Sequence, residues 1–272
     1  MTSVFKSAQG RDKIRAYYNQ ILSFFPYTKG YADTSFGKTF YMEAGSAQNP
    51  AVILLHGSCS NSAAWLGDIP ILAERYHVYA VDIIGEAGNS HEYRPALSEF
   101  PLWLSELMDA LNIPKAAIIG NSLGGWLALH FAAAFPEKAA VLVLIASSGI
   151  VPVKPSFLST TDKFLGSGGT DSSLIDSALS GVPKEARDFM ALVFENFNPI
   201  TGDLPVLSDE QLRTLTMPLL LIAGKDDFTM DANQAAARLQ SLVPHAKVHL
   251  IDGSHVIIDT TGTVMPFLLG KD

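Results

Sequence analysis

A serine stands between two glycines at the point where an apolar run that reads as a buried strand meets one that reads as a buried helix. The sequence there is Gly120-Asn121-Ser122-Leu123-Gly124, with the apolar runs at 116–119 and 125–132. A strand that reverses into a helix within a few residues needs a very tight turn, and flanking glycines remove the side chains that would collide there. The apex residue is then strained, with its side chain above the sheet. The pattern predicts a nucleophilic Ser122, although the same glycines would also suit a junction that only needs close packing.

Apolar runs that read as strands alternate with helical patterns over most of the chain. The predicted strands cover 51–55, 78–82, 116–119, 141–145, 219–223 and 247–251. Apolar residues at helical spacing occupy several of the gaps, at 100–111, 123–135 and 231–242. Strands that are apolar on both faces and alternate with helices indicate a mostly parallel sheet flanked by helices. Such a sheet binds ligands beyond the carboxyl ends of its strands.

Two segments lie outside this alternation. Residues 12–25 predict an amphipathic helix that Pro26 ends, and residues 31–34 and 39–43 predict a hairpin. From 147 to 217 the chain is rich in proline and glycine, too long for a plain connection. We expect a core domain at 1–146 and 218–272, with residues 1–30 as an N-terminal helical extension, and a cap or lid at 147–217. The large apolar residues of this cap would face the pocket or form the cap's own core: Phe157, Phe164, Leu165, Phe189, Met190, Phe194 and Phe197.

Composition and charge exclude several classes of function. The net charge is −8 and no run of Lys or Arg occurs, so nucleic acid and anionic membranes are poor partners. No apolar run approaches the length of about 20 residues that spans a membrane, and the first fifteen residues contain no apolar signal region. The one cysteine, Cys59, allows no internal disulfide. We therefore expect a cytoplasmic protein.

A nucleophilic serine needs a base and a carboxylate that orients the base. His255 follows the last predicted strand and returns to the same edge of the sheet as Ser122. The other histidines lie in or before strands, in a helix or in other loops: His56, His77, His91, His130, His245 and His249. Two adjacent aspartates, Asp226 and Asp227, follow the strand 219–223, and Asp82, which ends an earlier strand, is a weaker candidate.

An oxyanion needs two backbone donors. The N–H of Leu123 stands directly after the serine at a helix start, where the helix dipole also favours negative charge. The second donor is expected from the loop after the strand 51–55, which reads His56-Gly57-Ser58-Cys59. Cys59 lacks a basic neighbour in the sequence that would lower the pKa of its thiol, so we expect it to be inert.

From Val52 to the C-terminus the chain resembles the α/β-hydrolase superfamily. The resemblance rests on His56-Gly57, on residues 82–90, on residues 120–125, on Gly224-Lys225-Asp226-Asp227 and on Gly253-Ser254-His255. It implies an α/β-hydrolase fold with a helical cap inserted late in the sheet, and a catalytic triad of Ser122, Asp227 and His255. It also implies an oxyanion hole made by the N–H groups of Ser58 and Leu123. Residues 82–90 depart from the Gly-x-Gly-x-Ser of many relatives, which we expect to affect the sheet edge rather than the chemistry.

Within this superfamily the chain looks like bacterial carboxylesterases. The resemblance implies hydrolysis of a small, largely apolar ester through an acyl-enzyme, with no cofactor and no metal. The sequence Gly-Asn-Ser-Leu-Gly-Gly is also similar to that of carbon–carbon hydrolases of ring-cleavage products, although Arg187 and Arg213 are the only cap arginines. A ligand-binding protein with little turnover is a third reading. The oligomeric state stays open between monomer and homodimer.

Overall fold

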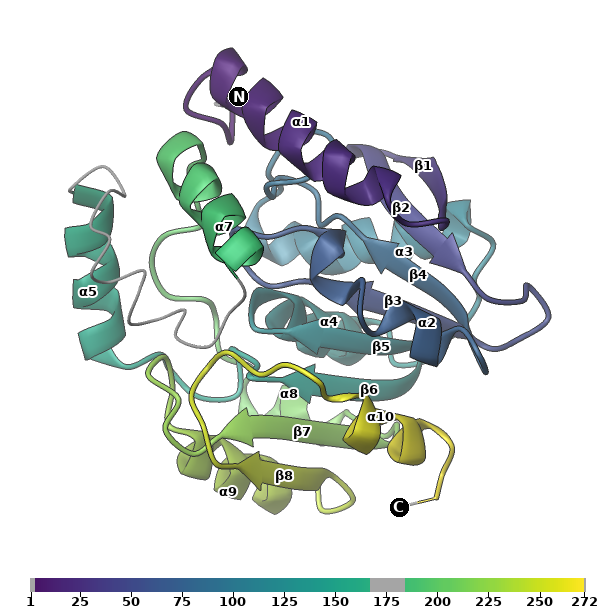
Figure 1. Cartoon of the computed structure of the whole chain (residues 1–272). Helices are drawn as coiled ribbons and strands as arrows, with labels where there is room; N and C mark the ends of the chain where they lie inside the picture. Colours follow the sequence, from purple (N-terminus) through teal and green to yellow (C-terminus); the bar gives the residue numbers. More distant parts are fainter. Residues whose placement is uncertain (1–2, 167–183, 272) are drawn as a thin grey trace.

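A single sheet runs through the molecule (Figure 1). The computed structural model describes residues 3–166 and 184–271, and within them the sheet has eight strands in the order β1-β2-β4-β3-β5-β6-β7-β8. The strands are β1 (Thr28–Thr34), β2 (Gly37–Ala44), β3 (Ala51–Leu55), β4 (His77–Val81), β5 (Ala116–Asn121), β6 (Ala139–Ile145), β7 (Leu219–Gly224) and β8 (Lys247–Ile251). β1 and β2 pair antiparallel with their neighbours, and β3 to β8 pair in parallel. The expected mostly parallel α/β sheet is confirmed.

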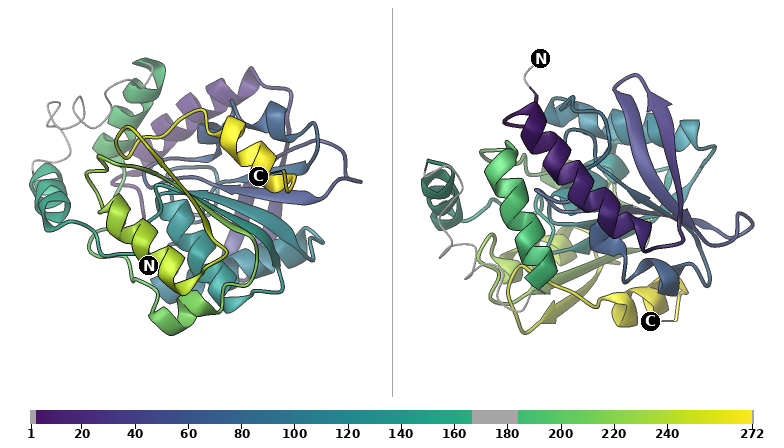
Figure 2. Two further views of the ribbon diagram at one scale, coloured as in Figure 1. Left: turned by 90° about the horizontal axis from the view of Figure 1, so that it is seen from below. Right: turned by 45° about the horizontal axis from the view of Figure 1, so that its top comes forward.

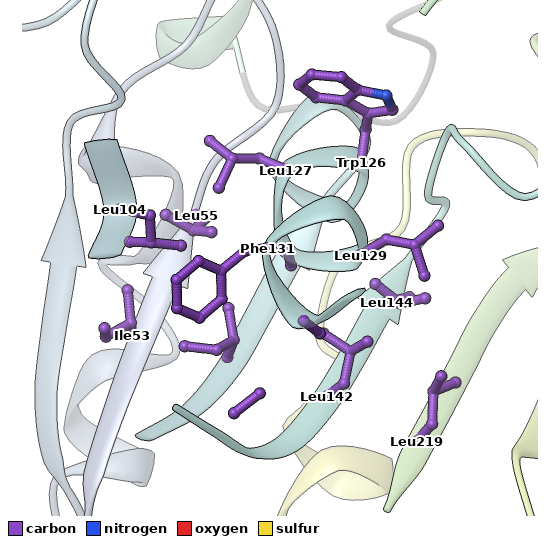
Figure 3. Close-up of a cluster of buried hydrophobic side chains, with 14 of the residues drawn as sticks. Ile53, Leu55, Leu104, Trp126, Leu127, Leu129, Phe131, Leu142, Leu144 and Leu219 are labelled. Atoms are coloured by element: carbon purple, nitrogen blue, oxygen red, sulfur yellow. The ribbon is translucent and has the colours of Figure 1, made fainter. Parts of the chain in front are cut away.

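Helices cover both faces of the sheet (Figure 2). The helices on one face are α3 (Phe100–Ala110), α4 (Leu123–Ala134), α8 (Asp209–Arg213) and α9 (Ala232–Leu242), and those on the other are α1 (Ala8–Ser23), α2 (Ile69–Leu72) and α10 (Thr261–Leu268). A separate hydrophobic cluster lies on each face of the sheet, and alternate residues of β3 belong to different clusters. Ile53 and Leu55 point toward α3 and α4, where they join Trp126 and Phe131 in one cluster (Figure 3). Val52 and Leu54 belong to the opposite cluster, as the two-residue period of a strand requires.

The N-terminal helix begins earlier than the apolar spacing indicated. Helix α1 starts at Ala8 because Ser7, in extended conformation, accepts a hydrogen bond from the N–H of Gly10. It ends at Ser23, three residues before Pro26. The two short 3₁₀ helices, Ser62–Trp65 and Leu97–Glu99, were not anticipated from the sequence.

The segment 147–217 contributes helices of two kinds. Helices α5 (Pro155–Gly166) and α7 (Lys184–Asn196) lie beyond the carboxyl ends of the parallel strands (Figure 1). Helix α8 instead packs with α9, and Leu207, Leu212, Leu215 and Met217 are buried in the core below it. Residues 167–183 of the expected cap lie outside the described residues, and the division into core and cap stays a prediction.

Helix α7 lies beside α1 and residues of the two helices are in contact (Figure 1). The ring of Phe189 stacks on Tyr17 at 5.6 Å, and Phe197 meets Phe5 edge-on at 5.7 Å. These two expected cap residues therefore pack against the N-terminal segment, an arrangement that neither expectation for the apolar cap residues included. Nothing is described for the side chains of Phe164 and Leu165.

Candidate active site

Ser122 stands at the apex of a sharp turn between β5 and α4. Its backbone has φ 51° and ψ −109°, and residues other than glycine rarely adopt a positive φ. The N–H of Ser122 donates to the carbonyl of Ile145 in the neighbouring strand, and its own carbonyl accepts from Trp126 in the helix. Both ends of the strained residue are thereby fixed, which is how a folded chain keeps such a conformation.

The two glycines of the motif allow this turn through close backbone approach. A Cβ on Gly120 would lie 2.2 Å from the carbonyl oxygen of Gly124. A Cβ on Gly124 would lie 2.1 Å from the carbonyl oxygen of Leu55 at the end of β3. Helix α4 can begin directly against two strands only because neither position carries a side chain.

The three side chains expected to form a triad lie in one hydrogen-bonded line. His255 Nε2 is 2.9 Å from Ser122 Oγ, and His255 Nδ1 is 2.8 Å from Asp227 Oδ2. With the ring proton on Nδ1 donated to the carboxylate, Nε2 is left to accept the hydroxyl proton of the serine. Asp227 is fully buried and His255 is largely buried, so little water competes for these bonds.

The loop after β7 places the two adjacent aspartates in different surroundings. Asp226 is exposed, whereas Asp227 turns inward. Its Oδ1 accepts from the N–H and the hydroxyl of Thr229, each at 2.7 Å, while Oδ2 faces His255. Burial alone would raise the pKa of Asp227, but the hydrogen bond and charge of His255, together with the Thr229 donors, hold that pKa below its usual value. The carboxylate beside the histidine therefore stays ionised at neutral pH.

Two contacts around this acid were not identified from the sequence. The Thr229 hydroxyl lies 3.1 Å from His255 Nδ1 as well as bonding to Asp227. Lys154, just before α5, donates from its N–H to the carbonyl of Thr229 at 2.7 Å, and from Nζ to the carbonyl of Asp227. The Asp-x-Thr spacing is a local signal for such a side-chain turn. Lys154 is distant in sequence and had no signal.

The two backbone groups expected to bind an oxyanion also lie at this edge. Leu123 is the first residue of α4, so its N–H lies in the unpaired first turn of the helix. The loop that contains Ser58 passes close to Ser122: a Cβ on Gly57 would lie 3.5 Å from Ser122 Cβ and 3.0 Å from the Asn121 side chain. β3 and β5 are neighbours whose connections leave on opposite faces, the switch point at which α/β sheets bind ligands.

The segment after β4 accepts hydrogen bonds from the backbone of the loop that contains Ser58 and from the residues that follow it. The buried Asp82 accepts hydrogen bonds from the N–H of Ser62, the hydroxyl of Tyr18 and the N–H of Asn89. Four residues on, the buried carboxyl of Glu86 accepts the N–H of Cys59 at 2.9 Å. The departure of residues 82–90 from the usual pattern therefore falls where they contact the loop of Ser58 and Cys59.

His56 and Cys59 have structural surroundings. Burial lowers the pKa of His56, and its neutral ring accepts the N–H of Ile83 at Nε2 and donates from Nδ1 to the carbonyl of Gly57. Burial raises the pKa of the Cys59 thiol to about 12, which leaves no thiolate at neutral pH. The other histidines lie away from Ser122: for example, His130 and His245 contact the carbonyls of Pro205 and Met217.

A serine, a histidine and an aspartate in hydrogen-bonded order, at a turn that follows a central parallel strand, form the arrangement that activates a hydroxyl for attack on a carbonyl. The model of the alpha/beta hydrolase family matches residues 52–263. The chain belongs to this family. It is 30% identical to an uncharacterized carboxylesterase, nap, of Bacillus subtilis over 88% of this chain and 85% of that protein.

Two further comparisons bear on the chemistry of this α/β hydrolase. The crystal structure of carboxylesterase CesB (YbfK) from Bacillus subtilis superposes with a TM-score of 0.83 at 25% identity, covering 97% of this chain and 99% of that one. A 2-hydroxy-6-oxo-2,4-heptadienoate hydrolase of Pseudomonas putida is 26% identical over 75% of this chain and 81% of that protein. The proteins that this chain resembles therefore include carboxylesterases and a dienoate hydrolase.

Proposed function

We propose that this α/β hydrolase is a serine carboxylesterase, in which Ser122, His255 and Asp227 form the catalytic triad. The observation that carries the proposal is the unbroken line from Ser122 Oγ through both ring nitrogens of His255 to the buried Asp227 carboxylate. The similarity to two carboxylesterases over most of the chain supports the same reaction.

In the proposed mechanism His255 takes the hydroxyl proton as Ser122 attacks the ester carbonyl. The carbonyl π electrons move to oxygen, and the N–H groups of Leu123 and Ser58 bind the resulting oxyanion. Collapse of the tetrahedral intermediate breaks the ester C–O bond, and His255 gives its proton to the leaving alcohol. A water activated by His255 then attacks the acyl-enzyme, releases the acid and restores the serine. Water is the only co-substrate, so the reaction needs neither metal nor cofactor.

We further propose that the substrate is small and largely apolar, and that α5 and α7 belong to the predicted cap at 147–217. The surroundings of His255 support this: Phe228 meets the imidazole edge-on at 5.6 Å, and Phe157 of α5 lies 6.0 Å from Phe228. Val256 and Ile258, which follow His255 in the sequence, are exposed. An ester with apolar acyl and alcohol groups would cover this surface. No described helix has the length and hydropathy to cross a bilayer, and a cytoplasmic location stays a prediction.

A carbon–carbon hydrolase is the second candidate. Such a substrate carries a carboxylate, and Arg187 on α7 has a buried Nε without a hydrogen-bond partner among the described residues. The other cap arginine, Arg213, is exposed on α8, which packs with the core. One partly buried arginine is a weak signal for a dienoate, and the ester hypothesis is therefore preferred.

The test compares kcat/KM for nitrophenyl esters of increasing acyl length, thioesters, lactones and a coloured dienoate. We expect the short apolar esters to give the highest kcat/KM, and Ser122→Ala to lower it by at least about 10³-fold. A dienoate hydrolysed faster than every ester would favour the second candidate. Equal ester turnover by wild type and Ser122→Ala would contradict the proposed triad. A protein that binds these compounds without turnover would instead be a ligand-binding member of the fold.

A further inference from the structure

The carboxyl group of Glu86 is buried directly beneath the loop that contains Ser58. Its Oε2 accepts the N–H of Cys59 at 2.9 Å, whereas Oε1 has no hydrogen-bond partner among the described residues. The side chain has no exposed surface. Removing a carboxylate from water is unfavourable, and a glutamate at this position has no part in the proton transfers of the triad. Its hydrogen bond to the Cys59 N–H connects this buried carboxyl to the loop.

The backbone that Glu86 contacts is strained. Cys59 has φ 57°, in the left-handed region that few residues other than glycine and asparagine adopt. The amide that Glu86 binds is the peptide joining Ser58 to Cys59, so the bond restricts rotation on both sides of it. The adjacent peptide, between Gly57 and Ser58, contains the N–H proposed to bind the oxyanion. Fixing one peptide plane therefore limits where the other can point.

A second hydrogen bond and a nearby charge complete this support. Asn61, two residues after Cys59, donates from Nδ2 to the carbonyl of Ala87 at 3.0 Å. Arg94 Nη2 lies 3.6 Å from Glu86 Oε1 and is itself held by the carbonyls of Gly85 and Asn198. Burial raises the pKa of Glu86 to about 7, against the opposing effects of Arg94 and the Cys59 N–H. The loop is thus held by hydrogen bonds to Glu86 and Ala87, and the Glu86 carboxyl lies beside the fixed guanidinium of Arg94.

We propose that Glu86 is a positioning residue for the oxyanion hole: it holds the Cys59 amide and thereby places the Ser58 N–H for the charge that develops on the substrate oxygen. This inference rests on the proposed function, because it presumes acyl transfer at Ser122. A displaced donor weakens binding of the transition state more than binding of the uncharged ester. Loss of Glu86 therefore lowers kcat and leaves KM nearly unchanged.

The test uses Glu86→Met, which fills the site without an acceptor, and Glu86→Gln, which keeps an oxygen for the Cys59 N–H. For Glu86→Met we expect kcat on a nitrophenyl ester to fall about tenfold to a hundredfold, with KM within about twofold. The Ki of a trifluoromethyl ketone, whose serine adduct contains an oxyanion, should rise in parallel. Glu86→Gln should restore kcat to within about threefold of wild type.

The matched control is Thr39→Val, at a position away from the site. This change removes another buried hydrogen bond, which the Trp103 indole N–H donates to Thr39 Oγ1 at 2.9 Å. It should lose stability without losing kcat. Wild-type kcat and ketone Ki in Glu86→Met would overturn the inference, as would a Glu86→Gln enzyme as impaired as Glu86→Met. Glu86→Ala replaces Glu86→Met should the latter fail to fold. Turnover that survives Ser122→Ala would instead contradict the proposed function, so the two failures are distinguishable.

Discussion

The three residues of the proposed triad could be identified from their positions in the sequence. Ser122, Asp227 and His255 each follow a predicted strand, and parallel strands bring their carboxyl ends to one edge. Residues that contact the triad or the loop of Ser58 were not recognisable in this way. Thr229, Lys154 and Glu86 act through contacts that depend on how loops fold back. Apolar runs in the sequence predict where strands end, but they do not predict the contacts that loops make.

The adjacent aspartates give a matched pair for the role of the acid. Asp227→Asn replaces the buried carboxylate that faces His255 Nδ1 with an amide, which cannot hold the ring in the required tautomer. We expect kcat to fall by about 10³- to 10⁴-fold. Asp226→Asn changes an exposed neighbour and should leave kcat within about twofold of wild type. Steady-state kinetics on one nitrophenyl ester measures both variants, and an equal loss in the two would contradict the assignment.

The strands were predictable because each central one is a short apolar run in which most residues are buried. β3 and β8 have the predicted ends, and β2, β4, β5, β6 and β7 differ from the prediction by one or two residues at one or both ends. β1 begins at Thr28, three residues before the predicted hairpin strand 31–34. The N-terminal boundary of α1 differed by four residues, because the cap at Ser7 lies before the first apolar position of the periodic pattern. Hydrophobic spacing locates the buried face of a helix, whereas capping side chains determine its end.

The junction of β5, α4 and β3 allows a prediction at this scale. Gly124→Ala places a Cβ 2.1 Å from the Leu55 carbonyl, so the helix must move away from the strand. We expect a loss of at least about 2 kcal/mol in the free energy of unfolding and a large fall in kcat, since Ser122 moves with the helix. Gly262→Ala is the control, because its Cβ in α10 would meet nothing within 4 Å. That variant should be neutral or slightly stabilising in urea unfolding. Equal stability of the two variants would contradict the account.

The α/β sheet could be predicted from the sequence, whereas the packing of the different parts of segment 147–217 could not. Residues 205–217 read as part of a long insertion, yet Leu207, Leu212 and Leu215 are buried in the core. The association of α7 with α1 could not be predicted from the sequence either. It joins segments more than 160 residues apart through Phe5, Phe197 and a short antiparallel bridge between them. Apolar residues in a cap look alike in the sequence whether they face a pocket, each other or the N-terminus.

If His255 and Asp227 make Ser122 a nucleophile, a reagent that reacts with activated serines should label it covalently. The folded protein is treated with a fluorophosphonate, and the modified peptide is identified by mass spectrometry in wild type, Ser122→Ala and His255→Ala. We expect one label per chain on Ser122 in wild type, no label in Ser122→Ala, and labelling slowed by at least about a hundredfold in His255→Ala. A folded wild-type protein that stays unlabelled, or equal labelling of wild type and Ser122→Ala, would contradict it.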